Sequence, residues 1–488
     1  MKKYFLLSLV CLGSWQVFGQ LKQFDLKTYK QPELNRFQLD FNLSQNNNSS
    51  VPSNDSYEEL EGIKKKSSFS FNGQGVFSWY RNSANYQGQT RSTLSFHPHT
   101  EKVKFENNDR DDTKFKRNQL SFSLNSENFF YDSNNWFIAP EIDLDYSSNK
   151  LDGESLSGNS TNEYDNSWHN YDNIKRVGAN IKASFSAGKG RIERVEDARQ
   201  VLHILDALNE DGRLKRIPSN EEIIQIAQRV SEVKNERFFD FRHKQMYEIR
   251  EMDAILKEMD LINEDDALYY TNLYDMWQHG ANEERLAGER FSIGLSPLYN
   301  RFDSESDGHY HYEGIQKYLA IIGFIRFEYE NPINQKWQSS IFSEISYGSI
   351  KGETESSSDD SQNNNFHNNT FTSEINCNNI NADLGYTIGF YPNTRTYASA
   401  NAMLTYKTFN GEIEEDIYSN DFDYKDIQGQ LKIELHYYIS PQVRLKCTTG
   451  TLYSSTESQE LPYYINNLGY SPNKWTNYFE LNLRFSVF

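Results

Sequence analysis

Apolar and polar side chains alternate one by one along most of the chain. The first clear run, residues 37–44, switches between aromatic or aliphatic side chains and amides, acids or serine. A period of two puts all the apolar side chains on one face of an extended strand, whereas a helix would scatter them. The pattern returns many times, most plainly at residues 136–146, 319–329, 380–390, 398–406, 431–439 and 479–487. We count about fourteen strands of this kind.

The links between these strands alternate in length. Short links follow every second strand, at residues 82–85, 125–135, 331–335, 392–395 and 440–442. Long polar links follow the other strands, at residues 45–67, 147–173, 300–314, 352–369 and 456–474. Transmembrane β-barrels place short turns in the periplasm and long loops outside the cell. We therefore predict an antiparallel barrel with both ends of the mature chain in the periplasm.

Between residues 191 and 288 the period changes from two to nearly four, which predicts an α-helical insert. Four amphipathic helices are expected, with apolar stripes over residues 195–208, 223–230, 238–259 and 268–277. Ser219 and Glu222 have the spacing of a capping box at the start of the second helix. The insert follows strand six, so it belongs on the periplasmic side. It is expected to be a bundle below the barrel, a plug within or across its lower mouth, or an inert folded insertion.

The first nineteen residues have the three parts of a secretory signal peptide. Lys2 and Lys3 precede an apolar run over residues 4–15, and the small Gly19 precedes the expected cleavage site. The mature chain then starts at Gln20 or Leu21. The expected organisation is a signal peptide (1–19), a periplasmic segment (20–32), strands one to six (33–190), the helical insert (191–288) and strands seven to fourteen (289–488).

Composition separates a barrel from the alternatives. The mean hydropathy is −0.80, yet the chain contains 32 Tyr and 32 Phe, which a disordered chain would not carry. A barrel explains both features, because one face of each strand is wet and aromatic side chains gather at the two membrane interfaces. The main competitor, a soluble β-sandwich or β-rich secreted enzyme, lacks the alternation of long and short links.

The charge and the cysteines exclude other classes of protein. Loss of the two signal-peptide lysines takes the formal charge from −19 to −21, which makes nucleic acid a poor partner. Cys377 and Cys447 are the cysteines of the mature chain. They are too few for a disulfide-stapled secreted fold, and we expect no bridge between them.

The signal peptide, the strand rhythm and the terminal Phe488 resemble those of bacterial outer-membrane β-barrel proteins over almost the whole mature chain. The resemblance implies a location in the outer membrane, in contact with its lipid and lipopolysaccharide. It also implies delivery to the barrel-assembly machinery, which reads an aromatic C-terminal strand. In this chain the apolar face ends at Val487, so Phe488 is out of phase with the expected signal.

No residues are predicted to carry catalysis or to bind a cofactor or metal. His97 and His99, like His309 and His311, are two apart, and two ligands are fewer than a metal site needs. His436 lies on the inward phase of its strand and has no nucleophile near it in sequence. The acidic loop segments 109–112, 303–307 and 359–360 do not have the spacing of a calcium loop.

The sequence thus favours a transport-related barrel, a pore or exporter component, and not an enzyme. Its periplasmic helices would gate the channel or dock a periplasmic protein partner. The inward strand positions, such as Lys432, Glu434 and Lys446, predict a wet lumen of mixed charge that suits polar solutes. The alternatives are a non-transporting barrel that acts as an adhesin or envelope scaffold, and an outer-membrane hydrolase, for which a nucleophile set is lacking.

Overall fold

The computed structural model describes residues 24–485 apart from 51–62, 106–112, 158–167, 237–239, 281–283, 308–309, 361–368, 416–418, 441–442 and 460–473. The predicted signal peptide and Phe488 lie outside these residues. The strands are β1 (Leu34–Ser50), β2 (Ile63–Ser83), β3 (Tyr86–Phe105), β4 (Thr113–Tyr131), β5 (Trp136–Ser157), β6 (Trp168–Arg194), β7 (Leu286–Asp307), β8 (Tyr310–Pro332), β9 (Trp337–Asp360), β10 (Asn369–Asn393), β11 (Thr396–Glu415), β12 (Ser419–Ser440), β13 (Val443–Gln459) and β14 (Lys474–Phe485). The helices are the 3-10 turn η1 (Leu26–Thr28) and the α-helices α1 (Glu196–Glu210), α2 (Asn220–Asn235), α3 (Phe241–Glu258) and α4 (Ala267–His279).

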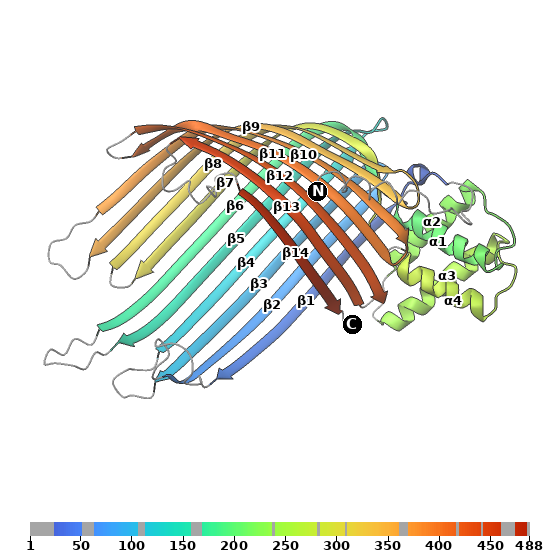
Figure 1. The fold of residues 1–488 in the computed structure, drawn as a ribbon, viewed down its shortest axis with the longest axis horizontal. Coiled ribbons are helices and arrows are strands. Elements are labelled where there is room, and N and C mark those ends of the chain that lie inside the picture. Colours follow the sequence, from blue (N-terminus) through green and yellow to red (C-terminus); the bar gives the residue numbers. More distant parts are fainter. Residues whose placement is uncertain are drawn as a thin grey trace, which may run out of the picture.

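All fourteen strands belong to one antiparallel sheet, in which each strand pairs with its neighbours in sequence order. Among the described residues β1 and β14 are the two edges of this order. Figure 1 shows the sheet curved strongly about its long axis, with the strands running between one end that carries the helices and an opposite end. The predicted strand number and antiparallel topology are confirmed.

The two faces of the sheet have the opposite character to those of a soluble protein. On β7 the apolar Ile293 and Leu295 are 57% and 59% exposed, whereas Ser292 and Ser296 on either side of this pair are 4% and 2% exposed. We call these the outward and inward faces. Large apolar side chains exposed on one face and polar ones enclosed on the other are typical of a wall between lipid and a polar lumen. The fold is that of a bacterial outer-membrane β-barrel.

The strands are longer than the alternation predicts. β5 alternates cleanly from Trp136 to Tyr146 but continues as a paired strand to Ser157, and β4 reaches Tyr131. The long links expected at 45–67, 147–173, 300–314, 352–369 and 456–474, and the short link at 125–135, are therefore partly strand, and those boundaries were wrong. Beyond the bilayer both faces of a strand are wet, so the backbone ladder continues while the sequence no longer alternates.

The insert contains the four predicted helices, and its core is apolar. Ser219 and Glu222 form the predicted capping box, in which Ser219 Oγ accepts from the Glu222 N–H at 3.2 Å and Glu222 Oε2 accepts from the Ser219 N–H at 2.7 Å. The apolar stripes pack together, and Leu205, Ile226 and Leu273 are fully buried. Among the described residues no helix is long and apolar enough to cross a membrane.

The segment before β1 is part of the same core. Phe24, Leu26 and Tyr29 are buried among the helices. The Tyr29 hydroxyl lies 2.7 Å from Ser231 Oγ and donates to the Ala227 carbonyl at 3.3 Å. Burial raises the pKa of the Tyr29 phenol above its ordinary value. The chain therefore passes through the helical core before its first strand begins.

Candidate functional site

The helices lie at the end of the barrel where consecutive strands are joined by short turns (Figure 1). We call this the turn end, and the helices with residues 195–285 the helical domain. The turns between β2 and β3, β4 and β5, β8 and β9, and β10 and β11 surround the mouth of the barrel there. The contacts of the helical domain with these turns define the candidate functional site.

Two glycines bend the paired ends of β6 and β7, which carry the helical domain. We call these paired ends the β6–β7 ribbon. The paired ends of β6 and β7 contain Gly190 and Gly288, whose φ angles are +110° and +129°. L-residues rarely adopt such angles. A Cβ at Gly190 would also lie 2.1 Å from the carbonyl oxygen of Glu289. Only glycine fits at this place, and the ribbon leaves the barrel wall there.

Beyond the bend the ribbon reaches a part of the rim formed by strands that are not its neighbours. Arg191 donates to the carbonyl oxygens of Ala84 at 2.7 Å and Ser83 at 2.9 Å, in the β2–β3 turn. The side-chain amide of Gln87 donates to the Ile192 carbonyl at 3.0 Å. Because β2 and β6 are not neighbours in the sheet, these bonds hold the ribbon against a separate part of the rim.

Arg285, directly before β7, anchors the end of the helical domain to the β8–β9 turn. Its side chain is fully buried. Its nitrogens donate to the carbonyl oxygens of Asn334, Gln335 and Trp337 at 2.9–3.0 Å and to Gln338 Oε1 at 2.7 Å. Burial and the nearby Arg199 lower the pKa of the guanidinium to about 10, so it stays charged at neutral pH.

Two helices contact turns of the rim directly. Gln335 of the β8–β9 turn donates to Asp206 of α1 at 3.2 Å, and Arg395 of the β10–β11 turn donates to Asp275 of α4 at 3.2 Å. The β1 strand lies close to α2. The helical domain therefore touches the rim from β1 to β11 and lies across the mouth, with its helices beyond the ends of the strands (Figure 1).

The interface between α1 and the rim is rich in cations. The guanidinium groups of Arg199 and Arg285 lie 4.9 and 4.5 Å from the centre of the Tyr391 ring. Burial, followed by repulsion from Arg199, Arg285 and Lys336, lowers the pKa of His203 to about 3. His203 is therefore neutral at physiological pH. Small changes in pH near 7 leave the charge of this residue unchanged.

Ion pairs cross the lumen behind the mouth. Arg326 on β8 pairs with Glu344 on β9 at 2.7 Å and with Glu141 on β5 at 3.4 Å. Arg290 on β7 pairs with Glu328 at 2.7 Å and with Glu127 on β4 at 3.8 Å. Each arginine thus joins strands that are three apart in the sheet. These bridges narrow the lumen near the turn end.

The residues that the sequence singled out for chemistry do not form a shared site. His97 and His99 lie on the inward face of β3, and His311 pairs with Asp307 and Glu313. No group of three or more His, Cys, Asp or Glu side chains suited to a metal ion occurs among the described residues. His309 and residues 109–112 lie outside them.

His436 has the inward position that its strand phase predicted, and it is 6% exposed beside Arg444 and the ring of Tyr397. Cys377 and Cys447 carry free thiols, so the two are not bridged. Sequence reasoning missed Arg285, Tyr29 and the two bend glycines, because their partners are far away in the chain. The one available signal was the presence of glycines at both ends of the insert.

Comparison with known proteins adds distant structural similarity. No protein-family model matches the chain, and no curated protein sequence matches it. The translocator domain of the autotransporter NalP from Neisseria meningitidis aligns with 78% of this chain and 86% of its own, at 7% identity and a TM-score of 0.26. The ferric yersiniabactin uptake receptor FyuA from Yersinia pestis aligns with 89% of this chain and 62% of its own, at 8% identity and a TM-score of 0.30.

A third structure is a loop-deletion mutant of OmpT, an outer membrane protein of Vibrio cholerae. It aligns with 92% of this chain and 99% of its own, at 8% identity and a TM-score of 0.21. The assignment of the fold rests on this chain's own strand pairing and on the character of its two faces.

Proposed function

We propose that this chain is a transport-related β-barrel of the outer membrane, a pore or exporter component, and that its helical domain closes the periplasmic mouth. The observation that carries the proposal is the placement of the helical domain. Arg285 bonds it to the β8–β9 turn, and Asp275 of α4 accepts from Arg395 of the β10–β11 turn. The end of β6 that leads into it is bonded to the β2–β3 turn by Arg191. A domain held across a mouth by a few polar contacts can close it and can also be released.

The side chains that line the lumen favour a polar cargo. Its inward side chains include a hydrogen-bonded group around Asp383, which accepts from Thr405 Oγ1 at 2.6 Å and from Asn381 at 2.6 Å. Lys432 and Lys446 both pair with Glu434. Acyl chains would have to displace the hydration of such groups, whereas a polar solute can replace it. The mixed charges give no strong preference for anions or cations.

The proposal also includes the orientation of the barrel in the outer membrane and the partners of the helical domain. The turn end faces the periplasm, because barrels of this class put short turns there. The outward face contacts the lipid of the outer membrane, and the helical domain is where a periplasmic protein would bind to release the mouth. The chain acts by passage or binding, not as an enzyme.

Swelling of proteoliposomes in sugar solutions tests the proposal. The full chain is compared with a variant in which residues 195–285 are replaced by a short glycine-serine turn. We expect the full chain to admit small sugars slowly and the deletion variant to admit them about tenfold faster or more, because a barrel of this size without a cover leaves an aqueous path. Heat-modified gel mobility controls for folding. Equal, slow uptake by two folded proteins would favour the scaffold or adhesin alternative.

A further inference from the structure

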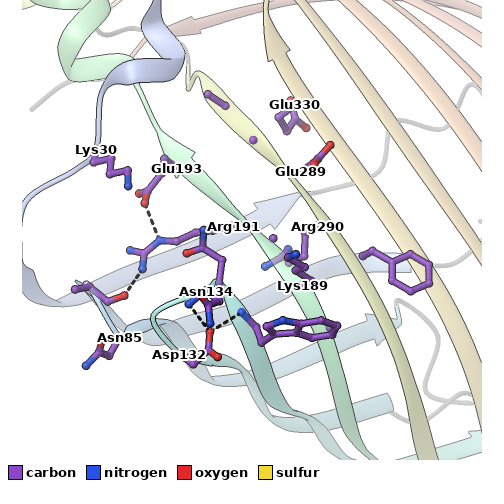
Figure 2. A pocket seen from close by; sticks show the side chains of 18 of the residues that line it. Lys30, Asn85, Asp132, Asn134, Lys189, Arg191, Glu193, Glu289, Arg290 and Glu330 are labelled. Atoms are coloured by element: carbon purple, nitrogen blue, oxygen red, sulfur yellow. Dashed lines mark hydrogen bonds and ion pairs between the residues drawn. The ribbon is translucent and has the colours of Figure 1, made fainter.

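A cavity of about 1410 Å³ opens at the turn end, where the β6–β7 ribbon bends away from the barrel wall. We call it the rim cavity. Its walls are the segment 27–33, the β2–β3 and β4–β5 turns, the end of β6 and the starts of β7 and β8. Figure 2 shows polar and charged side chains from these separate parts of the chain around one space.

One wall of the rim cavity is apolar and continuous with the lipid-facing surface. It consists of Trp136, Phe291, Ile293 and Phe327. All four are on the outward faces of β5, β7 and β8, and all are exposed. Aromatic side chains at the ends of barrel strands mark the level of the lipid headgroups. The cavity therefore opens at headgroup level.

The charges that line the rim cavity are balanced. Five cationic and five acidic side chains contribute to it. Several of them already have partners in the protein: Arg191 pairs with Glu193 at 2.7 Å, and Asp132 accepts the backbone N–H groups of Asn134 and Trp136 at 2.7 and 2.9 Å. A balanced lining favours a ligand that carries both signs over a simple anion.

Lys189 and Glu289 remain available next to the apolar wall. The Lys189 ammonium lies 5.5 Å from the centre of the Trp136 ring, and among the described residues no acidic oxygen lies within ion-pair distance of it. Glu289 is also exposed and without an ion pair among those residues. Lys189 pairs with Phe291 and Arg191 pairs with Glu289, so the two charges are diagonal neighbours with Cα atoms about 7–8 Å apart.

We propose that the rim cavity binds one phospholipid with a zwitterionic headgroup. Lys189 and the edge of Trp136 hold the phosphate, Glu289 holds the headgroup ammonium, and the acyl chains lie along Phe291 and Ile293. A free phosphate would leave the apolar wall uncovered, and an anionic lipid would leave Glu289 unneutralised beside it. The proposal rests on the membrane orientation given above, but it does not require that the lumen conduct.

Native mass spectrometry of the delipidated full chain in detergent tests this site. The probe is phosphatidylethanolamine, compared with phosphatidylglycerol and with glycerophosphoethanolamine, the headgroup without acyl chains. We expect one tightly bound phosphatidylethanolamine, with binding weakened about tenfold by Lys189→Gln and by Glu289→Gln, since each substitution removes a charge-assisted contact. Ala187→Trp, which fills the cavity without changing its charge, should abolish the bound lipid.

The control is Arg81→Gln. Arg81 also lies 5.5 Å from an aromatic ring, that of Tyr86, at the same end of the barrel but outside the rim cavity. Its loss should leave lipid binding unchanged. Equal binding of phosphatidylglycerol, equal competition by the free headgroup, or unchanged binding in the three cavity variants would each overturn the proposal. Because binding is read without any conductance measurement, its failure is distinct from failure of the proposed transport function.

Discussion

Arg285 is the residue through which the helical domain is most firmly attached to the barrel. A buried guanidinium is stabilising only when its donors are satisfied, and here three carbonyl oxygens and one amide oxygen accept from it. These carbonyl groups belong to a turn, so they have few other partners in the protein. Loss of the arginine leaves these four acceptors without the donors that it supplies.

Arg285→Gln should detach the helical domain without unfolding the barrel. We expect the free energy of docking to fall by about 2–4 kcal/mol, because several buried carbonyl groups lose their donor. Proteolysis of the segment between α4 and β7 should then become at least about tenfold faster. Arg285→Lys is the matched control for charge. It keeps the cation but cannot reach four acceptors, so it should also release the domain. Protection equal to that of the unmodified chain in both variants would contradict this role.

Glu196 makes the stability of the helical domain depend on pH. Burial and repulsion from Asp197 raise its pKa from 4.5 to about 7, so the folded domain favours the protonated acid. Its contribution to stability is present below pH 4.5 and is lost as the pH rises to about 7. Glu196→Gln should therefore stabilise the domain above pH 7 by about 1–3 kcal/mol and change little at pH 4. Calorimetry at the two pH values checks this, and an equal effect at both would refute it.

At the scale of the element, the bend in the β6–β7 ribbon places the helical domain. Gly190 and Gly288 have positive φ angles on paired strands, and both positions exclude a Cβ through close backbone contacts. A straight ribbon would instead carry the helices away from the barrel and Arg191 out of reach of the β2–β3 turn.

Gly190→Val should therefore displace the helical domain. The backbone conformation alone should cost about 1–3 kcal/mol, in addition to the clash with the carbonyl of Glu289. Gly429→Ala is the matched control, because a Cβ at that strand position meets nothing within 4 Å. Hydrogen exchange at Ile192 and in the β2–β3 turn should rise in the first variant only. Unchanged exchange in Gly190→Val would show that the bend does not position the domain.

The elements themselves could be predicted where lipid imposes a pattern. The outward positions of β5 from Trp136 to Tyr146 are apolar. The alternation there predicted both the presence of the strand and which of its residues face outward. Ser148 and Lys150 continue the same face into water, where nothing selects apolar side chains, so the end of the strand could not be predicted. The helices were predictable because their apolar stripes pack on one another, and Ser219 and Glu222 mark a start directly.

At the scale of the whole molecule, strand parity predicted the end of the barrel at which the helices lie. It could not predict which turns they touch. Arg285 bonds to residues about fifty positions away, and Arg191 to residues more than one hundred positions away. Such contacts are between polar groups that leave no periodic signal. The packing of Tyr29 in the helical core could not be predicted either, because six strands separate Tyr29 from the helices in the sequence.

The most direct test of closure by the helical domain is single-channel conductance with a reversible tether. Asp206 and Gln335, whose side chains are 3.2 Å apart, are replaced by cysteine in a chain with Cys377→Ala and Cys447→Ala, and are bridged by a short reducible linker. We predict that the bridged protein stays closed and that a reductant brings back opening steps, whereas single-cysteine controls show the same openings before and after reduction. Conductance that is the same with the bridge intact and broken would contradict gating by this domain.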